Sequence, residues 1–113
     1  MIKKFEVEFL EYAVEFLNTI DEKARTKLIF NIDKAKILND PKVFKKLDNY
    51  IWEFRAESKK LQFRLLAFWD KRDKNNTLVI CSHGFIKKDE KTPAKELHRA
   101  QEIMFQYFNQ FKS

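Results

Sequence analysis

The spacing of apolar and polar residues predicts two helices in the first third of the chain. From Glu8 onward, and again after Asp21, apolar residues recur with the period of a helix that buries one side. Asp21 is placed to cap the second helix, and Asn39–Pro41 is expected to end it. The short segment Lys3–Val7 predicts a first strand. The apolar stripes are Phe9, Tyr12, Ala13, Phe16, Leu17 and Ile20 in the first helix and Ala24, Leu28, Ile32, Ala35 and Leu38 in the second.

The middle of the chain changes to β-forming runs that are rich in aromatic and branched residues. Three such runs follow one another, at Tyr50–Ala56, Leu61–Trp69 and Thr77–His83. The polar segments Glu57–Lys60 and Asp70–Asn76 separate them and are typical of hairpin turns. Three adjacent strands with short links predict an antiparallel meander.

A last helix is expected after Thr92 and Pro93, a threonine at the N-cap and a proline at the first helical position. The order of elements is then strand, helix, helix, three strands, helix. This order predicts a single α+β domain over residues 1–113, with helices packed on a curved antiparallel sheet. The apolar stripe of the last helix comprises Leu97, Ala100, Met104, Tyr107 or Phe108, and Phe111.

Composition and charge narrow the class of protein. The chain has 113 residues, a net charge of +6 and a single cysteine, Cys81, which lies in an apolar run and is expected in the core. The histidines and the cysteine match no metal-ligand spacing, so we expect no metal and no cofactor. With no signal-peptide or membrane-span pattern, we expect a cytoplasmic protein without a membrane partner. The positive charge is typical of a protein that binds nucleic acid, or serves solubility alone.

Strand alternation places four polar residues on one face of the expected sheet. These residues are Glu53 and Arg55 in one strand and Gln62 and Arg64 in the next. One interpretation is a solvated face with a Glu–Arg pair across the strands. The other is an anion-binding surface, since the planar guanidinium matches phosphate with two donors.

The segment after the third run carries a lysine cluster and the chain's single glycine. Lys87, Lys88 and Lys91 lie close to the expected start of the last helix, which itself attracts anions. An anionic ligand would explain the cluster; alternatively, the lysines extend into water and Asp89 and Glu90 reduce their repulsion. Gly84 is expected to allow backbone freedom or a close approach as the strand ends.

Three other side chains are candidates for chemistry or stacking. His83 is a candidate general base, or a strand-end histidine hydrogen-bonded to the backbone. Phe85 and Trp69 are candidates for stacking on bases, although most aromatic residues of the chain are expected in the core.

Three motifs of the chain belong together: the strand Trp52–Arg55, the arginine at Arg64 in the next strand, and the segment Gly84–Pro93 before an alanine-containing helix. In combination they resemble the phage-derived, HigB-like branch of the RelE/ParE toxin superfamily. The resemblance covers most of the chain and implies a RelE-like fold. It implies a type II toxin that cleaves mRNA on the ribosome without a metal, by attack of a ribose 2′-OH on the adjacent phosphate.

The resemblance also implies roles for single residues. Arg55 and Arg64 would hold the scissile phosphate. Lys87, Lys88 and Lys91 would contact phosphate, and one of them would transfer a proton. Glu53 would orient an arginine or act as base, and His83 is a second acid/base candidate. Many relatives carry a tyrosine or histidine near the C-terminus for which this chain has no evident counterpart, so the acid and base stay open.

The implied partners are the ribosome, mRNA and a cognate antitoxin of the helix-turn-helix type, encoded by an adjacent gene. Two other functions fit the same fold. One is a ParE-like inhibitor of DNA gyrase that cleaves nothing, although such toxins generally lack the full set of cations. The other is a non-catalytic RNA-binding module.

Overall fold

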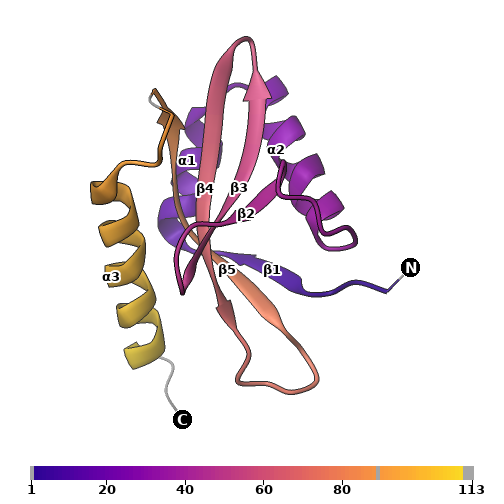
Figure 1. Ribbon diagram of the computed structural model, residues 1–113, viewed down its shortest axis with the longest axis vertical. Coiled ribbons are helices and arrows are strands. Elements are labelled where there is room, and N and C mark those ends of the chain that lie inside the picture. The colour runs from indigo at the N-terminus through magenta and orange to yellow at the C-terminus, as the bar shows by residue number, and fades with distance from the viewer. Residues whose placement is uncertain (1, 89, 111–113) are drawn as a thin grey trace.

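The computed structural model describes residues 2–88 and 90–110. Two expectations lie outside these residues: the place of Phe111 in the apolar stripe of the last helix, and the reduction of lysine repulsion by Asp89. The chain forms three helices and one sheet within this range (Figure 1). The elements in chain order are β1 (Glu6–Phe9), α1 (Glu11–Thr19), α2 (Glu22–Ala35), β2 (Phe44–Lys46), β3 (Ile51–Ser58), β4 (Leu61–Asp70), β5 (Leu78–Lys87) and α3 (Ala94–Gln110).

The sheet has five strands in the order β1-β5-β4-β3-β2 and is mixed. The meander β3-β4-β5 is antiparallel as predicted, but β1 runs parallel to β5, so the prediction of an antiparallel sheet is wrong for this edge. Parallel neighbours need a long crossover connection, which the chain between β1 and β5 supplies. Strand β2 was not predicted either, because its three residues are too few to establish a period.

Pairing with β5 shifts the first strand toward the C-terminus. The strand occupies Glu6–Phe9 instead of Lys3–Val7, and helix α1 begins at Glu11 instead of Glu8. The backbone N–H of Glu6 donates to Thr77, and that of Leu10 donates to Cys81. Tertiary pairing thus overrides the local helical period. Helix α2 is capped as predicted, since the Asp21 carboxylate accepts a hydrogen bond of 2.7 Å from the Ala24 N–H.

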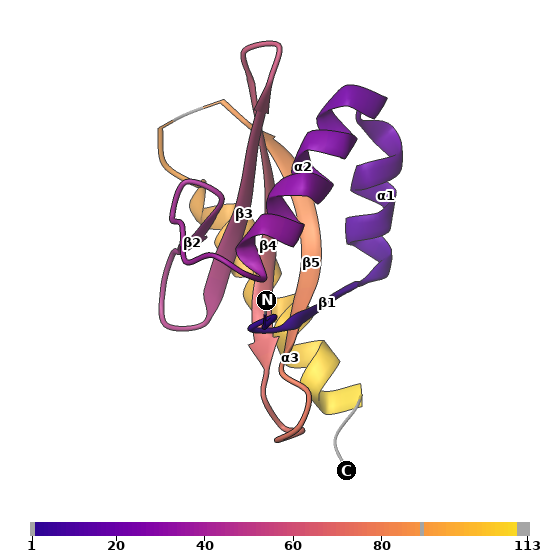
Figure 2. The same ribbon diagram turned by 90° about the vertical axis from the view of Figure 1, so that its right-hand side faces the viewer.

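The two faces of the sheet are covered by different helices. Helices α1 and α2 lie together on one side (Figure 2), where their apolar residues pack on β3, β4 and β5. Helix α3 covers the other face through Ala100, Ile103 and Tyr107. Both faces of the central strands are therefore buried. Leu38, expected in the stripe of the second helix, lies beyond α2 and is 51% exposed.

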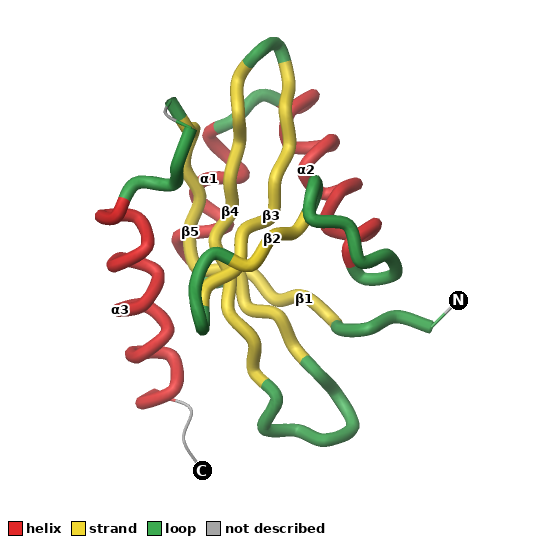
Figure 3. Tube along the Cα trace, in the orientation of Figure 1, coloured by secondary structure: helices red, strands yellow, loops and turns green. Residues whose placement is uncertain are grey.

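The turn between β3 and β4 fixes which residues face each other across the two strands. Only Lys59 and Lys60 separate the strands, and both have positive φ angles, 53° and 67°. Such values are those of a two-residue type I′ turn, which sets the register of a hairpin. The predicted turn, Glu57–Lys60, was two residues too long, because Glu57 and Ser58 continue β3. This turn and the β4–β5 loop lie at opposite ends of the sheet (Figure 3).

Strand β5 is longer than predicted and contains a bulge. It runs from Leu78 to Lys87 because pairing with β4 continues through Gln62 and Lys87. The register shifts so that Leu66 pairs with His83 and Ala67 with Cys81, which leaves Ser82 as the extra residue. The bulge lets Cys81 face α1 and α2, where burial raises the pKa of its thiol, while His83 faces α3.

Gly84 allows a close approach between β5 and helix α1. Its φ angle is not positive, so the backbone freedom of glycine is not what this position uses. A Cβ built on Gly84 would lie 2.5 Å from Cγ of Phe16, inside the contact distance of two carbon atoms. The glycine therefore makes room for the Phe16 ring.

Replacing Gly84 with alanine should destabilise the protein. Overpacking of this kind typically lowers the free energy of unfolding by about 1–3 kcal/mol. Urea denaturation of Gly84→Ala, Phe16→Leu and the double variant measures the effect and its coupling. Phe16→Leu should offset part of the loss by opening space. Unchanged stability of Gly84→Ala would contradict the close approach.

A polar cluster anchors the C-terminal part of α3 to the end of β4. The Tyr107 hydroxyl donates to Oδ2 of Asp70 at 2.7 Å, and Arg72 contacts the same carboxylate at 2.8 Å. Chiefly through the Arg72 hydrogen bonds, the pKa of Asp70 is lowered to about 2. Burial, followed by the Asp70 hydrogen bond, raises the pKa of Tyr107 to about 12.

Asp70 should make stability depend on pH in the acid range. A carboxyl whose pKa is lowered by folding contributes stability above its unfolded pKa and loses it as the pH falls through the folded pKa. Between about pH 4 and pH 2 the wild type should lose about 2 kcal/mol from this group, a loss that Asp70→Asn should lack. Tyr107→Phe removes one of the hydrogen bonds to Asp70, so its loss of stability over this pH range should be smaller than that of wild type. Parallel acid-unfolding curves for wild type and Asp70→Asn would rule out this role of Asp70.

Candidate functional site

Two arginines lie directly opposite each other in the β3–β4 hairpin. Arg55 pairs with Arg64 in the register of the strands. The Arg55 N–H donates to the Val43 carbonyl, and the Arg55 carbonyl accepts a 2.8 Å hydrogen bond from Nδ2 of Asn31. The backbone of Arg55 thus points away from β4, which makes the arginines a non-hydrogen-bonded pair. Side chains approach closest at such pairs, and like charges there repel.

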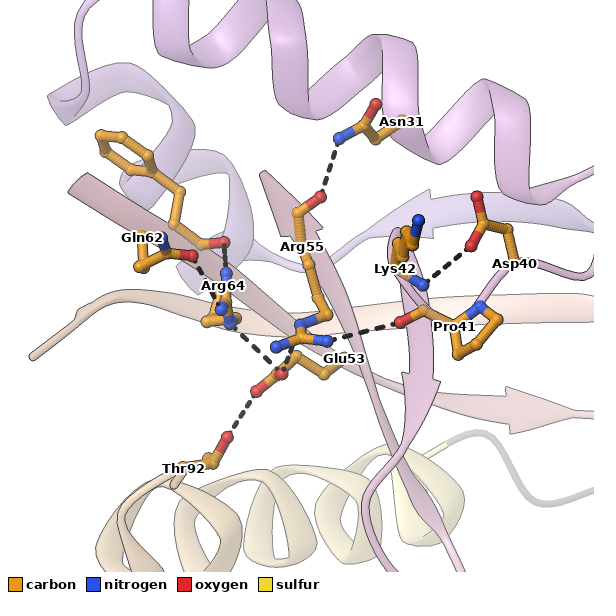
Figure 4. Close-up of polar contacts among 10 residues, drawn as sticks. Asn31, Asp40, Pro41, Lys42, Glu53, Arg55, Gln62, Arg64 and Thr92 are labelled. Atoms are coloured by element: carbon orange, nitrogen blue, oxygen red, sulfur yellow. Dashed lines mark hydrogen bonds and ion pairs between the residues drawn. The ribbon is translucent and has the colours of Figure 1, made fainter. Parts of the chain in front are cut away.

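A buried carboxylate compensates for this repulsion. Oε1 of Glu53 lies 3.4 Å from Nε of Arg55 and 3.3 Å from Nε of Arg64 (Figure 4). The Glu53 side chain is 1% exposed. Its other oxygen, Oε2, accepts a hydrogen bond of 2.5 Å from the Thr92 hydroxyl. Both carboxylate oxygens are therefore engaged, and Glu53 is suited to orient the arginines.

The guanidinium of Arg64 is held on several sides. Its Nη1 donates to the Phe63 carbonyl and its Nη2 to Oε1 of Gln62, both at 3.0 Å. Burial is the main cause that lowers the pKa of Arg64. Arg55 is less buried, with 26% of its side chain exposed, and its Nη1 lies 3.4 Å from the Pro41 carbonyl.

The Nε atoms of both arginines are buried but make no hydrogen bond in the described part of the chain, because their contact with Glu53 is an ion pair of poor hydrogen-bond geometry. Leaving a buried donor unsatisfied is costly. The arginine pair therefore carries a cost that its contacts within the described residues do not fully offset.

Two clefts of about 240 Å³ each open beside Arg55, which lines both. Their described lining residues include six cationic and three acidic side chains, a net charge of +3. The Lys87 cleft is lined by Lys45, Leu47, Glu53, Arg55, Lys87, Glu90, Lys91, Thr92 and Leu97. The Asn31 cleft is lined by Asn31, Lys42, Arg55, Ala56, Glu57, Gln62 and Arg64.

The three lysines of the expected cluster lie in different surroundings. Lys87 ends β5 beside the arginines, where burial first, and then the charge of Arg64, lowers its pKa. Lys91 lines the same cleft from the connection to α3. Lys88 is exposed and lines neither cleft. The structure thus brings Lys87 and Lys91 together with the arginines, but not Lys88.

His83 is buried under α3, away from both clefts. Its Nδ1 lies 3.1 Å from the Ser82 hydroxyl, and its Nε2 lies 3.0 Å from Oε1 of Glu96. These partners are side chains, so the expected backbone hydrogen bond at a strand end is wrong. Burial lowers the pKa of His83, and Glu96 opposes this shift.

The two stacking candidates lie on opposite faces of the sheet. Phe85 pairs with Arg64 across β4 and β5 and is half-buried on the arginine face. Trp69 packs on the other face, with ring centroids 5.1 Å from Phe5 and 5.7 Å from Trp52. Trp69 is thus part of the aromatic core and not of the arginine face.

Several polar residues near the arginines were not predicted as site residues, among them Asn31, Lys42, Lys45 and Thr92. Lys45 of β2 pairs with Glu53, and Lys42 lies just before β2. Both were missed because β2 is too short to be predicted from the sequence. Thr92 was expected to cap the last helix. That prediction is wrong, because α3 begins at Ala94, the Pro93 carbonyl accepts from the N–H groups of Glu96 and Leu97, and the Thr92 hydroxyl donates to Glu53.

Within residues 2–88 and 90–110, no three His, Cys, Asp or Glu side chains gather as a metal site would require. None of the helices in this range combines the length and the apolar character needed to cross a membrane.

The mixed sheet with helices on both faces and a cationic hairpin is consistent with a RelE-like fold. Residues 15–104, which include every residue lining the two clefts, match the family described as Phage derived protein Gp49-like (DUF891). The chain belongs to this family, a RelE/ParE-like toxin-type family whose members are commonly toxins of toxin–antitoxin systems. No curated protein matches the sequence significantly.

Removing the charge of Glu53 should strongly destabilise the protein. Glu53→Gln leaves the two arginines uncompensated, and breaking a buried ion pair in this way typically costs about 3–5 kcal/mol. Inorganic phosphate should restore more stability to this variant than to wild type, since the anion replaces the missing charge. Thermal unfolding in phosphate and in chloride of equal ionic strength measures both effects.

The matched control is Glu57→Gln, a change of an exposed carboxylate on the same strand. It should alter the free energy of unfolding by no more than about 0.5 kcal/mol. If the two variants lost equal stability, Glu53 would not be the group that holds the arginines.

Proposed function

We propose that this protein is the toxin of a type II toxin–antitoxin system and cleaves mRNA on the ribosome. The observation that carries the proposal is the arginine pair around buried Glu53, with Lys87 in the cleft that Glu53 and Arg55 also line. Membership of a toxin-type family supports it independently. A rigid set of cations beside a solvent-accessible cleft suits the stabilisation of a phosphorane that carries developing negative charge.

The proposed reaction is an internal transfer at one phosphodiester. The ribose 2′-oxygen forms a bond to phosphorus while the bond from phosphorus to the 5′-oxygen breaks. The 2′-OH gives its proton to a base and the leaving 5′-oxygen takes one from an acid, so the products are a 2′,3′-cyclic phosphate and a 5′-OH. Arg55 and Arg64 hold the phosphate through Nη N–H groups, since the Nε atoms of both face Glu53.

Lys87 is the proposed proton-transfer group among the described residues. Its lowered pKa brings a lysine closer to the range in which it can both take up and release a proton. Glu53 is assigned to orientation because both of its oxygens are engaged. Lys91 is assigned to phosphate contact at the rim of the cleft. His83, Lys88 and Trp69 have no role in the proposed reaction, since none of them lines a cleft beside the arginines.

The proposed partners are the ribosome, mRNA and a cognate antitoxin, in the cytoplasm. An antitoxin that covers the two clefts would meet a surface of net positive charge, so an acidic segment would complement it. A neighbouring gene for a small helix-turn-helix protein would fit this arrangement.

Lys87 and Lys88 offer a matched pair of variants for testing the site. Lys87→Ala should lower ribosome-dependent mRNA cleavage by about 100-fold or more, the usual contribution of a positioned acid or base. Lys88→Ala removes the same charge from the next residue and should change cleavage less than about threefold. Growth arrest without antitoxin, followed by cleavage in a reconstituted translation reaction, measures both variants.

Arg64→Ala should abolish cleavage, with circular dichroism and urea unfolding to establish that the variant is folded. Equal activity of Lys87→Ala and Lys88→Ala would remove Lys87 from the mechanism. Inhibition of DNA supercoiling without cleavage of mRNA would instead select the ParE-like function. RNA binding without either activity would select the non-catalytic module.

A further inference from the structure

The proposed reaction assigns Arg55 and Arg64 to the scissile phosphate but gives Lys42 and the amide side chains of the Asn31 cleft no role. The Asn31 cleft lies beside the free edge of β3, beyond the point where β2 stops pairing with it. It is lined by Lys42, from the α2–β2 connection, and by Gln62 of β4, both of which are labelled in Figure 4. Arg55 stands between the two clefts and lines both.

The side-chain amides at this cleft have orientations set by their partners. Asn31 must present its nitrogen to the Arg55 carbonyl, at 2.8 Å, because a carbonyl only accepts. Gln62 must present its oxygen to Nη2 of Arg64, at 3.0 Å, because arginine only donates. The amide nitrogen of Gln62 is therefore left as a donor that no hydrogen bond within the described residues uses.

The charge of the cleft favours an anion. Lys42 is exposed and makes no ion pair in the part of the chain that the structure describes. Together with Arg55 and Arg64 it gives three cations against two carboxylates, the exposed Glu57 in the lining and the buried Glu53 that contacts both arginines, so the net charge is positive. Lysine ammonium, arginine guanidinium and amide N–H donors are the groups that bind phosphate oxygens in proteins.

We propose that the Asn31 cleft binds a second phosphodiester of the same RNA strand, next to the one cleaved beside Lys87. The inference rests on the proposed function. An RNA strand that passes over Arg55 has one phosphate on each side of this residue, and the Arg55 guanidinium contacts both phosphates. Lys42 is then a substrate-binding residue that sets how far the RNA strand extends across β3.

Short RNA ligands that cannot be cleaved separate one phosphate site from two. The probes are 2′-O-methyl ApA, with one phosphodiester, and 2′-O-methyl ApApA, with two; methylation blocks the attacking oxygen. Wild type should bind ApApA at least tenfold more tightly than ApA, since the second contact is intramolecular, whereas a single site gives only the statistical factor of about two. In Lys42→Ala the ratio should fall to about two.

A longer ligand tests the same contact through salt dependence. For 2′-O-methyl hexa-adenylate, the slope of log affinity against log salt should become shallower by about 0.7 in Lys42→Ala, the value for one lost phosphate contact on a single strand. Lys46→Ala is the matched control, because Lys46 is exposed, pairs with Trp52 and lines neither cleft. Its slope and its ligand ratio should equal those of wild type.

The outcomes separate this inference from the function on which it rests. If wild type cleaves mRNA on the ribosome but Lys42→Ala and Lys46→Ala behave alike, the second phosphate site is refuted and the proposed function stands. If wild type neither binds these ligands nor cleaves mRNA, the proposed function falls and the inference falls with it.

Discussion

The arrangement of the site depends on one buried carboxylate. Two arginines directly opposite each other on neighbouring strands repel, and here one of them, Arg64, is almost fully buried. Glu53 lies within 3.4 Å of both guanidinium groups and makes the pair compatible with folding. Replacing such a cluster with apolar residues would usually leave a protein as stable or more so. Its presence in a small domain therefore supports the proposed role of the cluster in binding an anion.

Several features of the fold serve this cluster. The two-residue turn at Lys59 and Lys60 sets the register that places Arg55 opposite Arg64. Asn31 of α2 holds the backbone of Arg55 on the edge of β3 that faces away from β4, beyond the residues that β2 pairs with. Thr92 ties the segment before α3 to Glu53, so that Lys91 and Lys87 border the same cleft. Elements from both faces of the sheet thus converge on one hairpin, and the cations are positioned before any ligand arrives.

The residues of the hairpin were predictable from the sequence, whereas their surroundings were not. Alternation along two β-forming runs was enough to place Glu53, Arg55 and Arg64 on one face. The bulge at Ser82 was not predictable, because no glycine or proline marks it, and it decides that His83 faces α3. Lys42 and Lys45 were missed because a three-residue strand has no measurable period. Gly84 is the single glycine of the chain, but its role could not be predicted, because the Phe16 ring that requires it is distant in sequence.

In the proposed reaction this cluster promotes attack of a ribose 2′-OH on phosphorus. The reaction is tested most directly by the chemistry of the RNA ends formed when the purified protein acts on a translating ribosome. We expect 2′,3′-cyclic phosphate and 5′-OH ends, with no ends formed on an mRNA whose cleaved position carries a 2′-O-methyl group. Ends with a 5′-phosphate, or cleavage that persists on the methylated mRNA, would contradict it.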